Sequence, residues 1–341
     1  MSIIKEYLDH QKKYEKKYGK ERTIVLMQVG SFHEAYSTDK EGYDLQKLSE
    51  LLNIVVTKKN KSIEQVSLKN PYMMGFPSVA LEKFLNILID NNFTVVIIDQ
   101  VTPPPKPKRE VTGIYSPGTY INNLSTDSDS NFILSIFINE EKVFQKDKKI
   151  LCIGLSVIDL TTGENNIYES HSKIDDKYFA LDETIRFINC YAPKEIIICI
   201  KNQDCNKKEV INGFKYNDLL SYLDISNKII HRLEYDKVKE VEKLSYQNLF
   251  LNKIFPNQNS MLSSIEYINM ERMDYSRISY ILLLRYSHEH NSKIINNIKK
   301  PIIFSQNKYL HLGNNALHQL DVFTNEKSIN SGVQWKSLFD V

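Results

Sequence analysis

Apolar runs alternate with amphipathic segments over roughly the first 120 residues of the chain. The runs at 23–30 ("TIVLMQVG") and 93–99 ("FTVVIID") are continuous, which predicts two buried strands. Residues 3–18, 44–54 and 78–92 carry apolar side chains at helical spacing, which predicts three helices. Strands that alternate with helices are typical of a small mixed α/β domain.

A second region with strand patterning follows a polar, turn-rich stretch at 122–131, which we interpret as a linker. Residues 132–139 and 149–169 predict consecutive strands of a meander, with "TTGE" as a turn. Residues 180–191 predict a helix, and residues 194–200 ("KEIIICI") predict a further buried strand. This order predicts a second α/β domain.

From about residue 255 the pattern becomes helical, and residues 277–298 predict one long helix. His288 and His290 lie two positions apart on it, so their side chains diverge and chelate a metal poorly. Both are predicted to lie at the surface. The last residues carry no closing signal, and we expect a chain that stops inside a third, helical domain.

Composition adds limits to this picture. The chain has 341 residues, too many for one ordinary core, and a net charge of +2, so attraction to nucleic acid must come from local clusters of basic residues. Its four cysteines lack zinc-site spacing, which is typical of a reducing compartment. No apolar run approaches the roughly 18 residues of a membrane span. The first residues lack the apolar core of a secretion signal, so we expect an intracellular protein.

Four segments in order carry a resemblance to a known family. They are "VGSFHEAY", "LSELLNIVVTKK", "PYMMGFPSVALEKFLNILIDNNFTVVIIDQ" and "KREVTGIYSPGT". Together they resemble the mismatch-recognition domain of the MutS family of DNA mismatch-repair proteins. Abundant lysine, isoleucine and asparagine would suit a giant-virus or organellar branch, so the compartment, cytoplasmic or organellar, stays open.

The resemblance implies a multidomain fold of class α/β plus α. Residues 1–121 would form a small mixed α/β mismatch-recognition domain, and residues 131–250 a ribonuclease H-like α/β connector, with "GLSVIDLTTGE" as its clearest segment. Residues 255–341 would begin an all-helical lever or core domain. There, residues 308–323 ("KYLHLGNNALHQLDVF") resemble a helix of the family but depart from its usual Arg-Asn-Leu-Glu run.

The same resemblance implies that Phe32 and Glu34 bind mismatched duplex DNA. A mismatched pair stacks poorly, so an apolar wedge opens it at lower cost than a sound pair, and a phenylalanine ring stacks on any base. Glu34 would then hydrogen-bond the displaced base, accepting from a base N–H or, if protonated, donating. His33, between them, would either face the phosphates as a cation or pack inside the domain.

Other candidates for contact with the DNA backbone lie in three segments. Lys58, Lys59 and Lys61 form one basic loop, and Lys106, Lys108 and Arg109 form another in a stiff proline-rich stretch. Gly75, within "MMGFPS", lacks a side chain and would allow close approach of the chain to DNA, unless the segment is a plain loop before a helix that Ser78 caps. Solvated charge clusters are the alternative for both basic loops.

Enzymatic activity is not expected of these residues. They contain no G-x-x-x-x-G-K-[ST], so the ATPase domain that the resemblance implies, with ATP and Mg²⁺ as its cofactors, would lie downstream, and the full-length protein would form a homodimer. Asp159 alone is not the acidic cluster of a two-metal nuclease, and we interpret it as structural. The alternatives are a relative that binds recombination junctions and a metal-dependent nuclease based on the connector.

Overall fold

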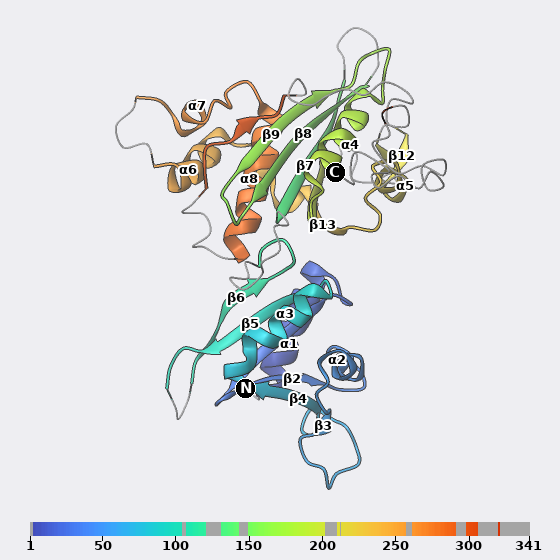
Figure 1. Ribbon diagram of the computed structural model, residues 1–341, viewed down its shortest axis with the longest axis vertical. Coiled ribbons are helices and arrows are strands. Elements are labelled where there is room, and N and C mark those ends of the chain that lie inside the picture. The colour runs from blue at the N-terminus through green and yellow to red at the C-terminus, as the bar shows by residue number, and fades with distance from the viewer. Residues whose placement is uncertain are drawn as a thin grey trace, which may run out of the picture. The chain divides into compact units, whose positions relative to one another are not determined.

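The structure is a computed structural model of the 341-residue chain. It describes residues 3–103, 107–120, 131–142, 149–201, 210–211, 213–256, 261–290, 298–305 and 320. Lys106, residues 122–130 of the predicted linker, and the segment 308–323 apart from residue 320 therefore lie outside the described residues. By the contacts among its residues the chain divides into two units, 1–302 and 303–341. The first unit contains two separate six-stranded sheets, shown in Figure 1.

The first sheet and its helices span the mismatch-recognition region predicted from the sequence. Its elements are α1 Ile3–Tyr18, β1 Thr23–Val29, β2 Phe32–Ser37, α2 Leu45–Leu52, β3 Thr57–Lys58, β4 Tyr72–Pro77, a 3₁₀ turn at Ser78–Ala80, α3 Leu81–Asp90, β5 Thr94–Gln100 and β6 Arg109–Tyr115. The strand order is β3-β4-β2-β1-β5-β6. Strands β1 and β5 run parallel, and the other neighbours run antiparallel. The predicted helices and buried strands are confirmed to within a few residues.

The central strands are buried because helices cover both faces of the sheet. Ile24, Val25, Leu26 and Met27 of β1 are all at most 2% exposed, although their side chains alternate between the faces. Helix α1 packs on one face, where Tyr7 donates a hydrogen bond to the carbonyl of Val25. Helix α3 packs on the other face (Figure 1). Burial on both sides explains the continuous apolar runs in the sequence.

The alternative of a plain loop at residues 73–78 and the predicted helix cap at Ser78 are both wrong. The segment "MMGFPS" is not a loop: residues up to Pro77 form β4, which pairs with β2 on one side and β3 on the other. Ser78 does not cap α3, because a 3₁₀ turn comes first and α3 begins at Leu81 without a side-chain cap. Instead the Ser78 backbone N–H donates to the carbonyl of Ser31, 2.8 Å away.

The second sheet has the order β13-β10-β7-β8-β9-β14. Its region contains β7 Phe132–Lys142, β8 Lys149–Asp159, β9 Asn165–His171, α4 Phe179–Tyr191, β10 Glu195–Lys201, β11 Val210–Ile211, β12 Phe214–Lys215, α5 Tyr216–Tyr222, β13 Ile229–Glu234, two 3₁₀ turns at Tyr235–Lys237 and Lys239–Glu242, α6 Leu244–Ile254, α7 Ser264–Tyr267, α8 Asp274–His290 and β14 Ile302–Ile303. The predicted meander is confirmed as β7, β8 and β9, joined by antiparallel pairing. Strands β10 and β13 add to it in parallel.

Helix α8 belongs to this second sheet, although we assigned its residues to a separate helical domain. It packs against β7, β8 and β9 (Figure 1). The contact is close because β8 offers Gly154, where an added Cβ would lie 2.0 Å from the carbonyl oxygen of Tyr275. Hydroxyl groups bridge the same seam, and Ser156 and Ser279 lie 3.0 Å apart between their Oγ atoms.

The start of α8 is also fixed by the sheet. Glu169 of β9 accepts hydrogen bonds from the backbone N–H groups of Tyr275 and Ser276, at 2.8 and 3.0 Å. A carboxylate at this position satisfies helix N–H groups that would otherwise lack partners, and it suits the positive end of the helix dipole. Among the helices of the described residues, none is long and apolar enough to cross a membrane.

Candidate nucleic-acid interface

The tip of the β1–β2 hairpin presents Phe32. Val29 and Phe32 are paired across the two strands, so the turn between them is Gly30 and Ser31. Gly30 has φ +63°, a conformation that glycine adopts without steric cost and that a two-residue hairpin turn requires. The sequence therefore forms a tight turn directly before the aromatic residue.

The Phe32 ring is accessible, and the strand beneath it is held on both sides. Its side chain is 44% exposed, so it is not part of the interior of the domain. Phe32 pairs with Val29 on β1 and with Pro77 on β4. The bond from Ser78 to Ser31 ties the hairpin tip to the end of β4. A rigid backbone that carries an exposed ring suits insertion between bases, because little conformational entropy remains to be lost.

Glu34 lies on the same face of β2 as Phe32, because side chains two positions apart on a strand share a face. Its carboxylate accepts a hydrogen bond from the hydroxyl of Tyr36. Opposite it on β4 is Gly75, where a Cβ would lie 2.9 Å from both Glu34 Cγ and the His33 carbonyl oxygen. The missing side chain of Gly75 thus makes room for Glu34 itself.

His33 points to the other face and is buried. Its side chain is 3% exposed and stacks on Phe76, with ring centroids 6.2 Å apart. Nε2 lies 3.0 Å from Asp99 Oδ1. This hydrogen bond lowers the pKa of Asp99, against the opposing effect of partial burial, and a hydrogen bond from Thr112 lowers it further. Of the two alternatives for His33, burial favours packing.

Arg109 and Lys108 lie at the same end of the sheet as Phe32. Strand β5 runs parallel to β1, and β6 begins at that end with Arg109, so the β5–β6 connection is close to the β1–β2 turn. The Arg109 Nε donates to the carbonyl of Gln28, 3.1 Å away, which fixes the half-buried side chain beside β1. Lys108 is exposed and forms an ion pair with Glu110.

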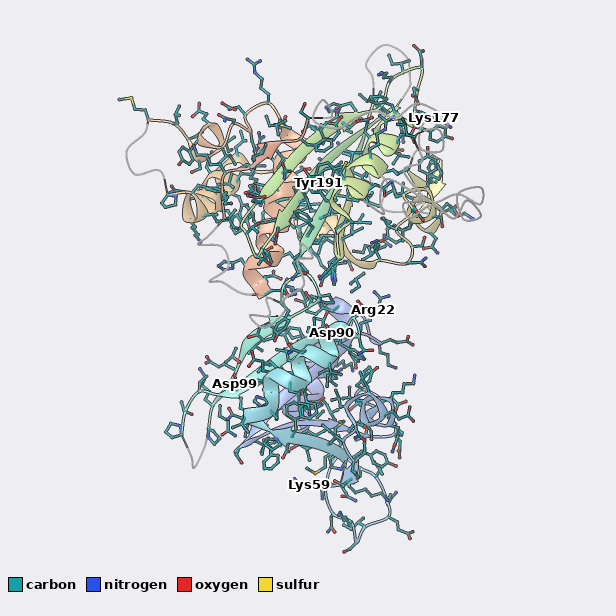
Figure 2. The ribbon with its side chains drawn as sticks, viewed as in Figure 1. Arg22, Lys59, Asp90, Asp99, Lys177 and Tyr191 are labelled. Atoms are coloured by element: carbon teal, nitrogen blue, oxygen red, sulfur yellow. The ribbon has the colours of Figure 1, made fainter. Side chains whose placement is uncertain are left out.

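The other basic loop lies at the opposite end of the sheet. Lys58 pairs with Tyr72, which pairs with Ser37 at the far end of β2 from Phe32. At about 3.3 Å per residue, β2 separates the two ends by roughly 17 Å. In Figure 2, Lys59 marks this loop, and Asp99, the hydrogen-bond partner of His33, marks the end of the sheet near Phe32.

Within that loop the lysine side chains differ in exposure and in hydrogen bonding. The ammonium group of Lys58 donates to the carbonyl of Glu64, 2.8 Å away, and so helps to shape the loop. Lys59 and Lys61 are exposed, and so is Lys69, which the sequence analysis did not select. Buried Asn70 organises the loop, with its amide group donating to Ile63 and Gln65 carbonyls.

Two neighbours of the site, Tyr36 and Asp99, are not among the residues predicted from the sequence. Tyr36 had a usable signal, because it lies two positions after Glu34 on a predicted strand and so shares its face. Asp99 had none, since it meets His33 only through the pairing of strands 66 positions apart.

Among the described residues, no group of side chains is suited to hold the metal ions that a nuclease would need. No cluster of three or more His, Cys, Asp or Glu side chains is found there that could hold a metal ion. Asp159 is 4% exposed and accepts hydrogen bonds from the Thr161 backbone and the Thr162 hydroxyl, which closes the β8–β9 turn. His288 is exposed, but the prediction for His290 is wrong. It is buried, because α8 turns that side toward the sheet.

Comparison with known proteins shows which family the sequence matches. Residues 4–123 match the family described as MutS domain I. The chain is 34% identical over its whole length to a mutS homolog of Acanthamoeba polyphaga mimivirus, of which it covers 31%. It is 25% identical over 99% of its length to the DNA mismatch repair protein MutS of Fervidobacterium nodosum, of which it covers 33%.

Among solved structures, Thermus thermophilus RuvC in complex with a Holliday junction substrate matches 48% of this chain and 97% of its own. The identity is 8% and the TM-score 0.29, too low to support a conclusion. The match to domain I covers the first sheet, and the two relatives match over nearly the whole chain, which defines the class of MutS-like proteins. The chain belongs to the MutS family, and it spans about a third of the length of the curated relatives that it matches.

Proposed function

We propose that this chain recognises mismatched duplex DNA by inserting Phe32 into the base stack, with Glu34 hydrogen-bonding the displaced base. The observation that carries the proposal is the exposed Phe32 ring at a braced hairpin tip, with Glu34 on the same face of the strand. A wedge at this position senses how easily a base step deforms, which differs between mismatched and sound pairs.

The basic residues would contact phosphates at two places along the duplex. Arg109 and Lys108 lie at the wedge end of the sheet and would contact the backbone next to the opened step. Lys59 and Lys61 lie about 17 Å away along β2, which corresponds to roughly five base pairs at 3.4 Å per step. A sheet laid along the duplex would thus contact the backbone at the lesion and again roughly five base pairs from it.

The relatives that this chain matches are longer than the chain itself. The proposal therefore extends to activities that would need the additional residues of such a protein. An ATPase domain using ATP and Mg²⁺, and a homodimer that holds the DNA, would involve parts beyond these residues. The 34% identity to a viral relative favours the giant-virus branch. The meander β7-β8-β9 followed by parallel β10 and β13 supports a ribonuclease H-like connector, with Asp159 shaping a turn.

The test compares the affinities of full-length protein for duplexes with and without one mismatch. Phe32→Ala is expected to bring the ratio of the two affinities close to one, because stacking on a base contributes about 1–3 kcal/mol. Glu34→Ala should weaken discrimination and leave binding to perfect duplex unchanged or slightly stronger, since a charge repelled by phosphates is removed.

Leu249→Ala is the matched control, because Leu249 is also an exposed apolar residue but lies on α6. It should leave both affinities unchanged. If Phe32→Ala keeps the full preference for mismatches, Phe32 is not the wedge. A relative that binds recombination junctions would prefer four-way junctions to mismatched duplex in the same assay.

A further inference from the structure

Glu34 contacts a second residue of its own strand, Tyr36, which was not predicted from the sequence. The Tyr36 hydroxyl donates to Glu34 Oε2, from the next position on the same face of β2. Within the described part of the chain, Tyr36 is the donor that reaches this carboxylate. The hydroxyl therefore determines where the carboxylate points.

Tyr36 is itself firmly held. It is 5% exposed, and its ring packs edge-on against Tyr7 of α1, with the ring centroids 5.3 Å apart. Tyr7 is fully buried and is fixed in turn by its hydrogen bond to the Val25 carbonyl, at 3.0 Å. A hydroxyl on an anchored ring has a defined position, unlike one on an exposed, mobile side chain.

The direction of this hydrogen bond is also defined. Burial raises the pKa of Tyr36 well above its ordinary value, and the hydrogen bond to Glu34 and the charge of that residue raise it further. The hydroxyl thus stays protonated and acts toward Glu34 as a donor.

On its other side, Glu34 faces strand β4 at Gly75. A Cβ there would lie 2.9 Å from Glu34 Cγ, so any larger residue would displace the side chain. Glu34 is therefore confined between the Tyr36 hydroxyl and the backbone at Gly75. Tyr36 and Glu34 of β2 and Gly75 of β4 together define the position of the carboxylate.

We propose that Tyr36 is a positioning residue for mismatch recognition, which holds the Glu34 carboxylate in place as a hydrogen-bond acceptor for the displaced base. The proposal rests on the function proposed above for Phe32 and Glu34. Without the hydroxyl, the carboxylate is free to change rotamer, and it must lose that freedom again when the base is bound.

The test is Tyr36→Phe in the full-length protein, with affinities measured for mismatched and matched duplexes. Loss of a hydrogen bond to a charged group should lower the ratio of the two affinities on the order of tenfold. Tyr168→Phe is the matched control, because it removes a tyrosine hydroxyl that donates to another carboxylate, that of Glu183, in the region of the second sheet. It should lower the melting temperature and leave the affinity ratio unchanged.

The same change in a Glu34→Ala background separates positioning from a general structural effect. If Tyr36 acts through Glu34, Tyr36→Phe causes no further loss of discrimination there. An equal loss in both backgrounds, or no loss in the wild-type background while Phe32→Ala and Glu34→Ala still reduce discrimination, overturns the inference and leaves the proposed function standing. If Phe32→Ala and Glu34→Ala also have no effect, the proposed function fails with it.

Discussion

At the scale of single residues, three consecutive positions of β2 have three different environments. Phe32 is exposed, His33 is 3% exposed beside Asp99, and Glu34 is half-buried beside Tyr36. Strand alternation produces the difference between His33 and its neighbours, because it turns His33 toward α3. His33, which lies between the two proposed DNA contacts, thus holds β2 against the interior of the domain.

His290 provides a prediction about pH. Burial lowers its pKa from 6.5 to about 4, outweighing the opposite effect of the Glu195 charge, and Nδ1 lies 2.8 Å from the Tyr286 carbonyl oxygen. The unfolded chain therefore binds a proton at higher pH than the folded chain does. This contribution to stability is complete above pH 6.5 and is lost as pH falls toward 4.

Between pH 7 and pH 5 the free energy of unfolding should fall by about 2 kcal/mol because of this group. The check is urea denaturation of wild type and of His290→Gln at both values of pH. The variant should lose about 2 kcal/mol less than wild type. His288→Gln, on the exposed side of the same helix, should behave like wild type, and equal losses in all three proteins would contradict the prediction.

At the scale of elements, the close approach of α8 to β8 depends on one missing side chain. Gly154 faces the first turn of α8, and serine hydroxyls link the two elements at the next positions along the strand. An interface of small residues lets the helix backbone lie directly on the sheet. The site in the first sheet follows the same principle, because Gly75 leaves space for Glu34.

Gly154→Ala should therefore destabilise the second sheet by about 1–3 kcal/mol, because the new Cβ would overlap helix backbone that cannot rotate away. Ser156→Ala is the comparison, since it removes the hydrogen bond to Ser279 without adding volume, and should cost about 1 kcal/mol. Thermal unfolding of the two variants gives the order. A Gly154→Ala protein as stable as wild type would mean that α8 is held less closely.

At the scale of the whole molecule, a net charge of +2 cannot by itself hold DNA. The first sheet instead carries local basic groups at its two ends, about 17 Å apart along β2. Attraction to phosphates would then come from a few side chains that contact the backbone at the opened step and at a distance from it. The number of these contacts is measurable through the salt dependence of binding.

Each phosphate contact contributes about −0.9 to the slope of log K against log salt concentration. Lys59→Ala combined with Lys61→Ala should make the slope less steep by up to about 2 and weaken binding to mismatched and matched duplexes alike. Phe32→Ala should leave the slope unchanged. Lys237→Ala removes an exposed lysine paired with Glu234 in the other sheet's region and serves as the control. An unchanged slope in the double variant would mean that this loop does not contact DNA.

The sequence by itself determined only part of both sheets, namely β1, β5, β7, β8, β9 and β10, together with the helices α1, α2, α3, α4 and α8. Phe32 and Glu34 came from the resemblance to the MutS family. The predicted elements follow from local patterns, because a run such as "TIVLM" needs burial on both faces and apolar side chains at helical spacing need one covered face. Local prediction failed at Ser78 and at β4, where pairing with β2 and β3 overrode the local turn signals.

Only the tertiary structure decided which of the candidate residues lie together. It placed Arg109 at the end of the sheet that carries Phe32, because β5 runs parallel to β1 and β6 starts where β5 ends. It placed Lys59 at the other end, because β4 pairs antiparallel with both β2 and β3. It also brought Asp99 to His33 and turned His290 inward. These contacts join residues distant in the chain, and a local pattern of polar and apolar positions contains no information about such partners.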